Sequence, residues 1–154
     1  MTADVQSQDR PQARAGVSGP AAAVQVLVVD DDALIRQLLS ECLRATGMAV
    51  TEAANGVQCL RAVEAASFDV IFMDIVMPEK DGLETTAELR RMGIKSWIIV
   101  ISSQKKVGDV MLLDAAKALG ADDAIHKPFN VATVARDVVT LLEKLKKDPA
   151  RALR

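Results

Sequence analysis

Residues 68–78 run Phe-Asp-Val-Ile-Phe-Met-Asp-Ile-Val-Met-Pro, a largely apolar stretch in which the carboxylate of Asp74 follows Met73. A strand this apolar has to lie inside a sheet, so a charge at its exit needs a chemical or structural reason. A second apolar run, residues 26–29, ends in three consecutive acids, Asp30, Asp31 and Asp32. Two buried strands that both end in carboxylates predict one shared anionic pocket.

Short β-branched runs alternate with segments of helical spacing from Val24 onward. Strict alternation predicts parallel strands joined by right-handed crossovers, and hence a three-layer α/β sandwich. The ligand crevice of such a sheet lies beyond the carboxyl ends of the strands, where the winding direction reverses. If the second strand lies at an edge and the third returns beside the first, Asp30, Asp31 and Asp74 converge on that crevice. The predicted strands are 24–30, 48–53, 68–74, 97–102 and 123–127, and the predicted helices are 33–46, 56–66, 81–92, 105–119 and 131–147.

Length and composition limit the classes of protein to consider. The 154 residues suit one domain, and half of them are apolar, enough for an ordinary core. We expect a disordered tail over 1–22, one domain over 23–147 and a short tail over 148–154. The net charge of -2 offers no basic face, which argues against nucleic-acid binding by this chain. Without a membrane-length apolar run or an export signal, we expect a cytoplasmic protein in which Cys42 and Cys59 are core residues.

The predicted pocket has the chemistry of a magnesium site. Two or three carboxylates within a few ångströms of one another require either a cation that offsets their repulsion or the protonation of one of them. Oxygen ligands without His or Cys favour a hard divalent ion, and Mg²⁺ fits a site that meets a phosphate. The fourth strand ends in Ser102 and the fifth is followed by Lys127, so a hydroxyl and an ammonium arrive at the same rim. An aspartate, a metal, a hydroxyl and a lysine are the groups needed to accept a phosphoryl group.

These residues occur as a set of motifs in one order along residues 24–146, and together the motifs resemble the receiver domain of two-component response regulators. The resemblance implies a flavodoxin-like, doubly wound sandwich with a five-stranded parallel sheet of order 2-1-3-4-5 and five helices. The motifs are Val28-Val29-Asp30-Asp31, Asp74 with Met77-Pro78 and Asp81-Gly82, the hydroxyl of Ser102, and Lys127-Pro128-Phe129.

The resemblance also implies a role for each pocket residue. Asp74 is the phosphoacceptor, and Asp30 and Asp31 hold Mg²⁺ together with Asp74 and the backbone carbonyl of Val76. The remaining two, Ser102 and Lys127, contact the phosphoryl group, and Lys127-Pro128 is typically a cis peptide.

The implied function is a phosphorylation-activated switch rather than an enzyme, because receivers only hydrolyse their own phosphate slowly. The implied donor is a histidine kinase or a histidine phosphotransfer protein. The signal then passes by protein–protein contact, and we expect a stand-alone receiver of the chemotaxis-regulator type. The apolar helix 105–119, with Ala124 and the helix from Val131, suggests a surface for an unidentified partner or for a phosphorylation-dependent homodimer.

Two positions depart from the family pattern. The family often carries an aromatic residue where Ala124 stands, and that ring moves with the phosphorylated state. Switching here must use another element, and residues 103–108 with the following helix are the candidate. The position two beyond the acceptor is apolar Val76, where relatives guide hydrolytic water. We therefore predict a long-lived acyl phosphate.

Two rival functions can be weighed from the sequence. Asp30-Asp31-Asp32 also resembles the opening motif of haloacid-dehalogenase-like phosphohydrolases, with Asp30 as nucleophile and Asp122-Asp123 as a later acidic motif. Against this reading, Leu34 replaces the expected Thr or Val and the chain is short for that fold. The other rival is a degenerate receiver that never takes phosphate and acts as a docking module.

Three residues near the pocket receive structural interpretations. Asp32 is predicted to cap the first helix or to stay solvated. The one histidine, His126, is predicted to pack, because strand alternation points it away from Lys127. Arg36 is predicted to be solvated or to support the cap of the first helix.

Overall fold

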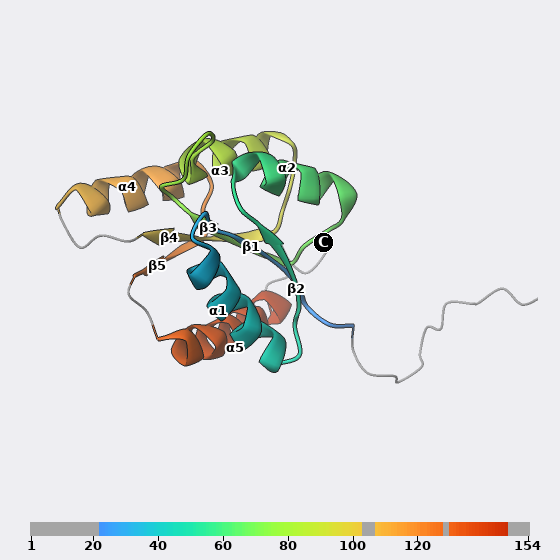
Figure 1. The fold of residues 1–154 in the computed structure, drawn as a ribbon. Coiled ribbons are helices and arrows are strands. Elements are labelled where there is room, and N and C mark those ends of the chain that lie inside the picture. Colours follow the sequence, from blue (N-terminus) through green and yellow to red (C-terminus); the bar gives the residue numbers. More distant parts are fainter. Residues whose placement is uncertain (1–21, 103–106, 128–129, 148–154) are drawn as a thin grey trace, which may run out of the picture.

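The structure, a computed structural model, describes residues 22–102, 107–127 and 130–147 of the chain. Strands and helices alternate throughout this part of the chain (Figure 1). The bounds of the helices and strands agree with the predicted bounds to within two residues. The first two residues of the predicted helix 105–119 fall outside the described ranges. The elements are β1 (Gln25–Val29), α1 (Ala33–Ala45), β2 (Ala49–Ala53), α2 (Gly56–Ala65), β3 (Val70–Asp74), α3 (Gly82–Arg91), β4 (Trp97–Ser102), α4 (Val107–Ala118), β5 (Asp123–His126) and α5 (Val131–Lys147).

The five strands form one parallel sheet in the order β2-β1-β3-β4-β5, which confirms the predicted doubly wound topology. The register sets the strand ends against one another. Val29 pairs with Met73, so Asp30 and Asp74 are the next residues on adjacent strands. Ser102 pairs with His126, which places Lys127 one residue beyond it. The candidate site residues therefore lie side by side at the carboxyl edge of the sheet.

The helices cover both faces of the sheet, with α1 and α5 on one face and α2, α3 and α4 on the other (Figure 1). Because side chains alternate along a strand, each central strand contributes to two cores. Val28 and Phe72 belong to the core under α1 and α5, whereas Val29 and Met73 belong to the other. Apolar runs in β1, β3 and β4 are thus explained by burial on both faces.

The structure tests three further predictions. Cys59 is buried and Cys42 packs against the core under α1 and α5, as predicted. The prediction that the His126 side chain packs is wrong, because this side chain is exposed at the end of edge strand β5. In the part of the chain that the structure describes, no helix combines the length and apolarity needed to cross a membrane.

Candidate phosphoryl-transfer site at the carboxyl edge

The loop between β1 and α1 fixes the first two acids. Asp30 is buried, and its Oδ1 accepts a 2.9 Å hydrogen bond from the backbone nitrogen of Asp32. Asp32 caps α1 as predicted, because its Oδ1 accepts a hydrogen bond of 2.9 Å from the nitrogen of Leu34. The cap starts the helix directly after the acids, so the exposed side chain of Asp31 stays at the strand end.

The turn between β3 and α3 fixes Asp74, whose side chain is nearly inaccessible. The nitrogen of Gly82 donates a 2.8 Å hydrogen bond to the carbonyl of Ile75, which folds α3 back over the strand end. A Cβ at Gly82 would collide with the carbonyl oxygen of Asp74. Asp81 caps α3 through a 2.8 Å bond from the nitrogen of Glu84. In the Asp81-Gly82 motif, Gly82 therefore permits the close approach of the turn to β3, and Asp81 caps the helix that follows.

The ends of β4 and β5 supply the hydroxyl and the ammonium. Ser102 is buried at the last position of β4. Its carbonyl accepts a 2.6 Å hydrogen bond from the nitrogen of Lys127. Lys127 Nζ lies 2.9 Å from Asp30 Oδ2 and 3.7 Å from Asp74 Oδ1. The predicted cis peptide before Pro128, and Phe129 with it, lie outside the described residues.

The three acids converge as predicted. One carboxylate oxygen from each of Asp30, Asp31 and Asp74 lies within 4.8 Å of the others. The pKa of Asp74 is raised from 3.8 to about 8, chiefly because burial disfavours the charged form. The charge of Asp30 and hydrogen bonds with Asp31 and Asp30 contribute to this rise, and Lys127 acts against it. Burial and the charge of Asp30 together outweigh Lys127, so all three acids stay ionised at neutral pH only if a further cation is bound. The oxygen-only ligand set therefore fits a hard divalent cation such as Mg²⁺.

Lys127 serves as the counter-ion of this cluster. Burial acts to lower its pKa, but the hydrogen bond to Asp30 and the charges of Asp74 and Asp30 leave the pKa above the usual value for lysine. The ammonium consequently stays charged at neutral pH. A fixed cation beside Asp74 can attract an incoming anion without waiting for reorganisation.

Arg36 has a structural role at this site that the sequence analysis missed. Instead of being solvated or supporting the helix cap, its Nη1 donates a 2.6 Å hydrogen bond to the backbone carbonyl of Asp30. Its Nε lies 3.3 Å from Glu52 Oε1 on the edge strand β2. One sequence alone does not predict this hydrogen bond, because it depends on the direction in which the loop points the Asp30 carbonyl and not on the spacing of side chains.

The two positions that depart from the family pattern have different surroundings. Val76 follows β3 in the turn, and 61% of its surface is exposed. Ala124 is half-buried in β5 and packs against the core that includes Leu113 and Ala116 of α4. Residues 103–106 of the predicted switching segment lie outside the described ranges.

The opposite edge of the sheet carries charges with a structural role. Arg90 bonds to the carbonyls of Gly120, Ile94 and Ser96 and to the carboxylate of Asp122, at 2.7–3.0 Å. Asp122 Oδ2 also accepts a 2.9 Å bond from the nitrogen of Ile98. This places Asp122 before β5, at the amino ends of the strands and away from Asp30. Asp122 is therefore too far from Asp30 to serve as the later acidic motif of the phosphohydrolase alternative.

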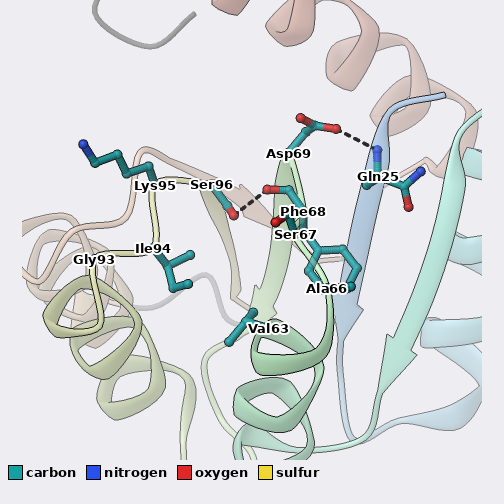
Figure 2. A pocket seen from close by; sticks show the side chains of 10 residues that line it. All are labelled: Gln25, Val63, Ala66, Ser67, Phe68, Asp69, Gly93, Ile94, Lys95 and Ser96. Atoms are coloured by element: carbon teal, nitrogen blue, oxygen red, sulfur yellow. Dashed lines mark hydrogen bonds between the residues drawn. The ribbon is translucent and has the colours of Figure 1, made fainter. Parts of the chain in front are cut away.

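A hollow of about 370 Å³ lies at the same amino edge, between the end of α2, the start of β3 and the turn before β4 (Figure 2). Ser96 Oγ donates a 2.6 Å hydrogen bond to the carbonyl of Phe68, and the nitrogen of Gln25 donates one of 2.8 Å to Asp69 Oδ2. Figure 2 shows these bonds joining neighbouring segments of chain. They tie β1, β3 and β4 together at their starts.

Comparison with known proteins identifies the family. Residues 26–139 match the response regulator receiver domain. The chain is 31% identical to the chemotaxis protein CheY4 of Vibrio cholerae, with a TM-score of 0.70 over 77% of this chain and 98% of that one. This chain belongs to the response regulator receiver domain family. Receiver domains of this family are phosphorylation-activated switches of two-component signal transduction, which bind Mg²⁺ at an acidic site and accept phosphoryl groups from histidine kinases or phosphotransfer proteins.

Curated relatives include longer proteins. The chain is 41% identical, over 124 residues, to a protein-glutamate methylesterase/protein-glutamine glutaminase of Nocardioides sp., covering 79% of this chain and 34% of that protein. It is 35% identical over 128 residues to the response regulator MprA of Mycobacterium leprae, covering 82% and 54% respectively. The chain thus spans about a third to a half of the length of these relatives, and the methylesterase name describes that relative alone.

Proposed function

We propose that Asp74 is the residue that accepts the phosphoryl group, in a reaction that requires Mg²⁺ held by Asp30, Asp31, Asp74 and the backbone carbonyl of Val76. The observation that carries the proposal is the convergence of three carboxylates within 4.8 Å, beside a lysine, at the carboxyl edge of the sheet. Asp74 is the acid at the end of β3 itself. Its Oδ1 lies 3.7 Å from Lys127 Nζ, the same ammonium that pairs with Asp30 at 2.9 Å.

Each residue has a defined task in the transfer. A carboxylate oxygen of Asp74 attacks the phosphorus, and the bond from phosphorus to the donor's nitrogen or oxygen breaks with its electron pair. Mg²⁺ held by Asp30, Asp31 and Asp74 would offset the charge of these acids and of the phosphoryl oxygens. Lys127 stabilises the transferred group once the carboxylate charge of Asp74 is consumed in the acyl phosphate. Ser102 donates its hydroxyl hydrogen to a phosphoryl oxygen.

The wider setting follows the same proposal. The donor is a histidine kinase or a histidine phosphotransfer protein, and the output is an unidentified protein or a second phosphorylated copy. We expect the contact surface to include α4 and β5, where Met111 is 72% exposed. We place the chain in the cytoplasm.

A labelling experiment tests the proposal. The full chain is incubated with acetyl phosphate with and without Mg²⁺, and the intact mass is followed over time. We expect one phosphoryl adduct in the wild type with Mg²⁺, and none after chelation or in Asp74→Asn. Asp122→Asn is the matched control, because it neutralises an acid at the opposite edge and should label normally.

Two results would contradict the proposal. An adduct that persists in Asp74→Asn but disappears in Asp30→Asn would support the phosphohydrolase alternative. A folded wild-type chain that takes no phosphoryl group from either acetyl phosphate or a phosphorylated histidine donor would support the degenerate docking module.

A further inference from the structure

Arg36 connects the loop that carries the acids to the edge of the sheet. On one side, its Nη1 donates to the carbonyl of Asp30 at 2.6 Å. On the other, its Nε pairs with Glu52 Oε1 at 3.3 Å, while Glu52 Oε2 lies 3.4 Å from Arg44. With only 19% of its side chain exposed, Arg36 is held in one geometry by its partners.

The loop needs such a restraint because its side chains repel one another. One oxygen from each of Asp30, Asp31 and Asp74 lies within 4.8 Å of the others, so the three carboxylates repel one another in the fully ionised form that metal binding requires. Lys127 holds the Asp30 carboxylate from inside the pocket. Arg36 holds the backbone of the same residue from outside it. The peptide that joins Asp30 to Asp31 is thereby fixed at the carbonyl, one bond from the start of Asp31.

We infer that Arg36 is a positioning residue for the magnesium site, one that preorganises the Asp30 and Asp31 carboxylates by anchoring the Asp30 carbonyl to the β2 edge. This inference rests on the proposed function, because it assigns Asp30 and Asp31 to the metal. Among the described residues, the side-chain contacts of Arg36 go to the Asp30 carbonyl and to Glu52 rather than to a carboxylate of the acidic cluster. Partners that orient metal ligands typically contribute ten- to a hundredfold in affinity.

A positioning role and a purely electrostatic role for Arg36 predict opposite changes in Mg²⁺ affinity when Arg36 is removed. Removing a cation near an anionic pocket makes the pocket more negative, and by Coulomb's law alone it would bind Mg²⁺ more tightly. Removing a positioning residue leaves the Asp30 carbonyl unpaired and the loop free to relax, so it would bind Mg²⁺ more weakly. The direction of the change therefore separates the two roles.

Arg44 offers a matched control. It carries the same charge, pairs with the other oxygen of Glu52 at 3.4 Å and bonds to the carbonyl of Val50 at 3.1 Å, but the contacts it makes do not reach Asp30. Arg36→Gln and Arg44→Gln change the net charge equally. Both disturb the β2 edge, and only Arg36→Gln disturbs the acidic loop.

The experiment measures Mg²⁺ affinity of the full chain by isothermal titration calorimetry, with thermal unfolding as a check of folding. We expect Arg36→Gln to weaken Mg²⁺ binding about tenfold and Arg44→Gln to change it less than twofold. At saturating Mg²⁺, acetyl phosphate should label Arg36→Gln at close to the wild-type rate. The Mg²⁺ affinity of Arg36→Lys should lie between those of the wild type and Arg36→Gln, because one ammonium cannot bond to both the Asp30 carbonyl and Glu52 as a guanidinium does.

The possible results are distinct. Tighter Mg²⁺ binding by Arg36→Gln, or equal weakening by Arg36→Gln and Arg44→Gln, would overturn the inference. If Arg36→Gln does not fold, Arg36→Lys decides, and unchanged affinity in that variant would overturn it. A wild-type chain that binds no Mg²⁺ would overturn the proposed function first and the inference with it.

Discussion

Both the amino edge and the carboxyl edge of the sheet carry charged side chains that are at least partly buried, but the charges have different partners at the two edges. At the amino edge, Arg90 makes hydrogen bonds to Asp122 and to backbone carbonyls. At the carboxyl edge, Asp30, Asp31 and Asp74 crowd together, and Lys127 pairs with only two of them. The amino edge is satisfied by its own contacts, whereas the carboxyl edge carries an excess of negative charge.

The difference teaches where to look for function. A buried charge whose partners are complete stabilises the chain path and needs no ligand. A buried charge whose neighbours share its sign is destabilising by itself, and it persists where a cation or a reaction gives it a role. Changes at the two edges should therefore affect stability in opposite directions.

The largest effect is expected at the amino edge. Arg90→Ala leaves Asp122 without its ion pair and three backbone carbonyls without a donor. We expect the free energy of unfolding to fall by about 3 kcal/mol. Urea unfolding followed by circular dichroism measures this. Labelling of the folded fraction by acetyl phosphate should stay unchanged, and a loss of labelling without a loss of stability would contradict the division between the edges.

At the carboxyl edge we expect a substitution to raise the free energy of unfolding rather than to lower it. In Mg²⁺-free buffer near pH 8, Asp74→Asn should raise the free energy of unfolding by on the order of 2 kcal/mol, because it removes a charge that burial and Asp30 disfavour. The same urea experiment applies. Lower stability in Asp74→Asn would show that the acidic cluster is already satisfied.

This stabilisation should depend on pH. Folding raises the pKa of Asp74 from 3.8 to about 8, so the folded chain binds the proton more tightly than the unfolded chain. Stability contributed by the protonated form is therefore lost as pH rises through this window. The difference between Asp74→Asn and the wild type should shrink at about pH 5 and grow toward pH 8. A difference that is constant with pH would assign the effect to packing.

Magnesium should act on one edge only. At about ten times its dissociation constant, Mg²⁺ should stabilise the wild type by about 1.4 kcal/mol through binding to the folded state alone. Arg90→Ala, with its acids intact, should gain the same amount. Thermal unfolding with and without chelator measures both gains, and a gain that is absent in Arg90→Ala would link the two edges.

The smallest change in stability is expected at Val76, whose side chain is largely exposed. Val76→Asn should leave the free energy of unfolding unchanged but shorten the life of the acyl phosphate several-fold, because an amide can orient water where valine cannot. Loss of the adduct after removal of acetyl phosphate gives the rate. Equal decay in the wild type and Val76→Asn would refute the predicted long lifetime.

The fold was predictable because strand ends follow from topology. Apolar runs in β1, β3 and β4 indicate burial on both faces, and alternation with helices makes the strands parallel. Once β3 lies beside β1, the residues after Val29 and Met73 must be neighbours. The sequence therefore predicted the meeting of Asp30 with Asp74 without any knowledge of side-chain geometry.

Contacts to backbone atoms were not predictable in the same way. Arg36 was expected to be solvated or to support a cap, yet its guanidinium bonds to the carbonyl of Asp30. Asp122 resembled part of a catalytic motif, yet it binds Arg90 and the nitrogen of Ile98. Both bonds depend on the path of a loop, which residue spacing does not encode. His126 was misplaced because an edge strand leaves side chains exposed on both faces.

The most direct measurement is the position of the phosphoryl group on the chain. After reaction with acetyl phosphate and Mg²⁺, the acyl phosphate is trapped by borohydride reduction and the modified peptide is sequenced by mass spectrometry. The modification is expected on Asp74, in the peptide that contains β3. Modification of Asp30 in the wild type would contradict the assignment of the acids and reverse the roles of the two strand ends.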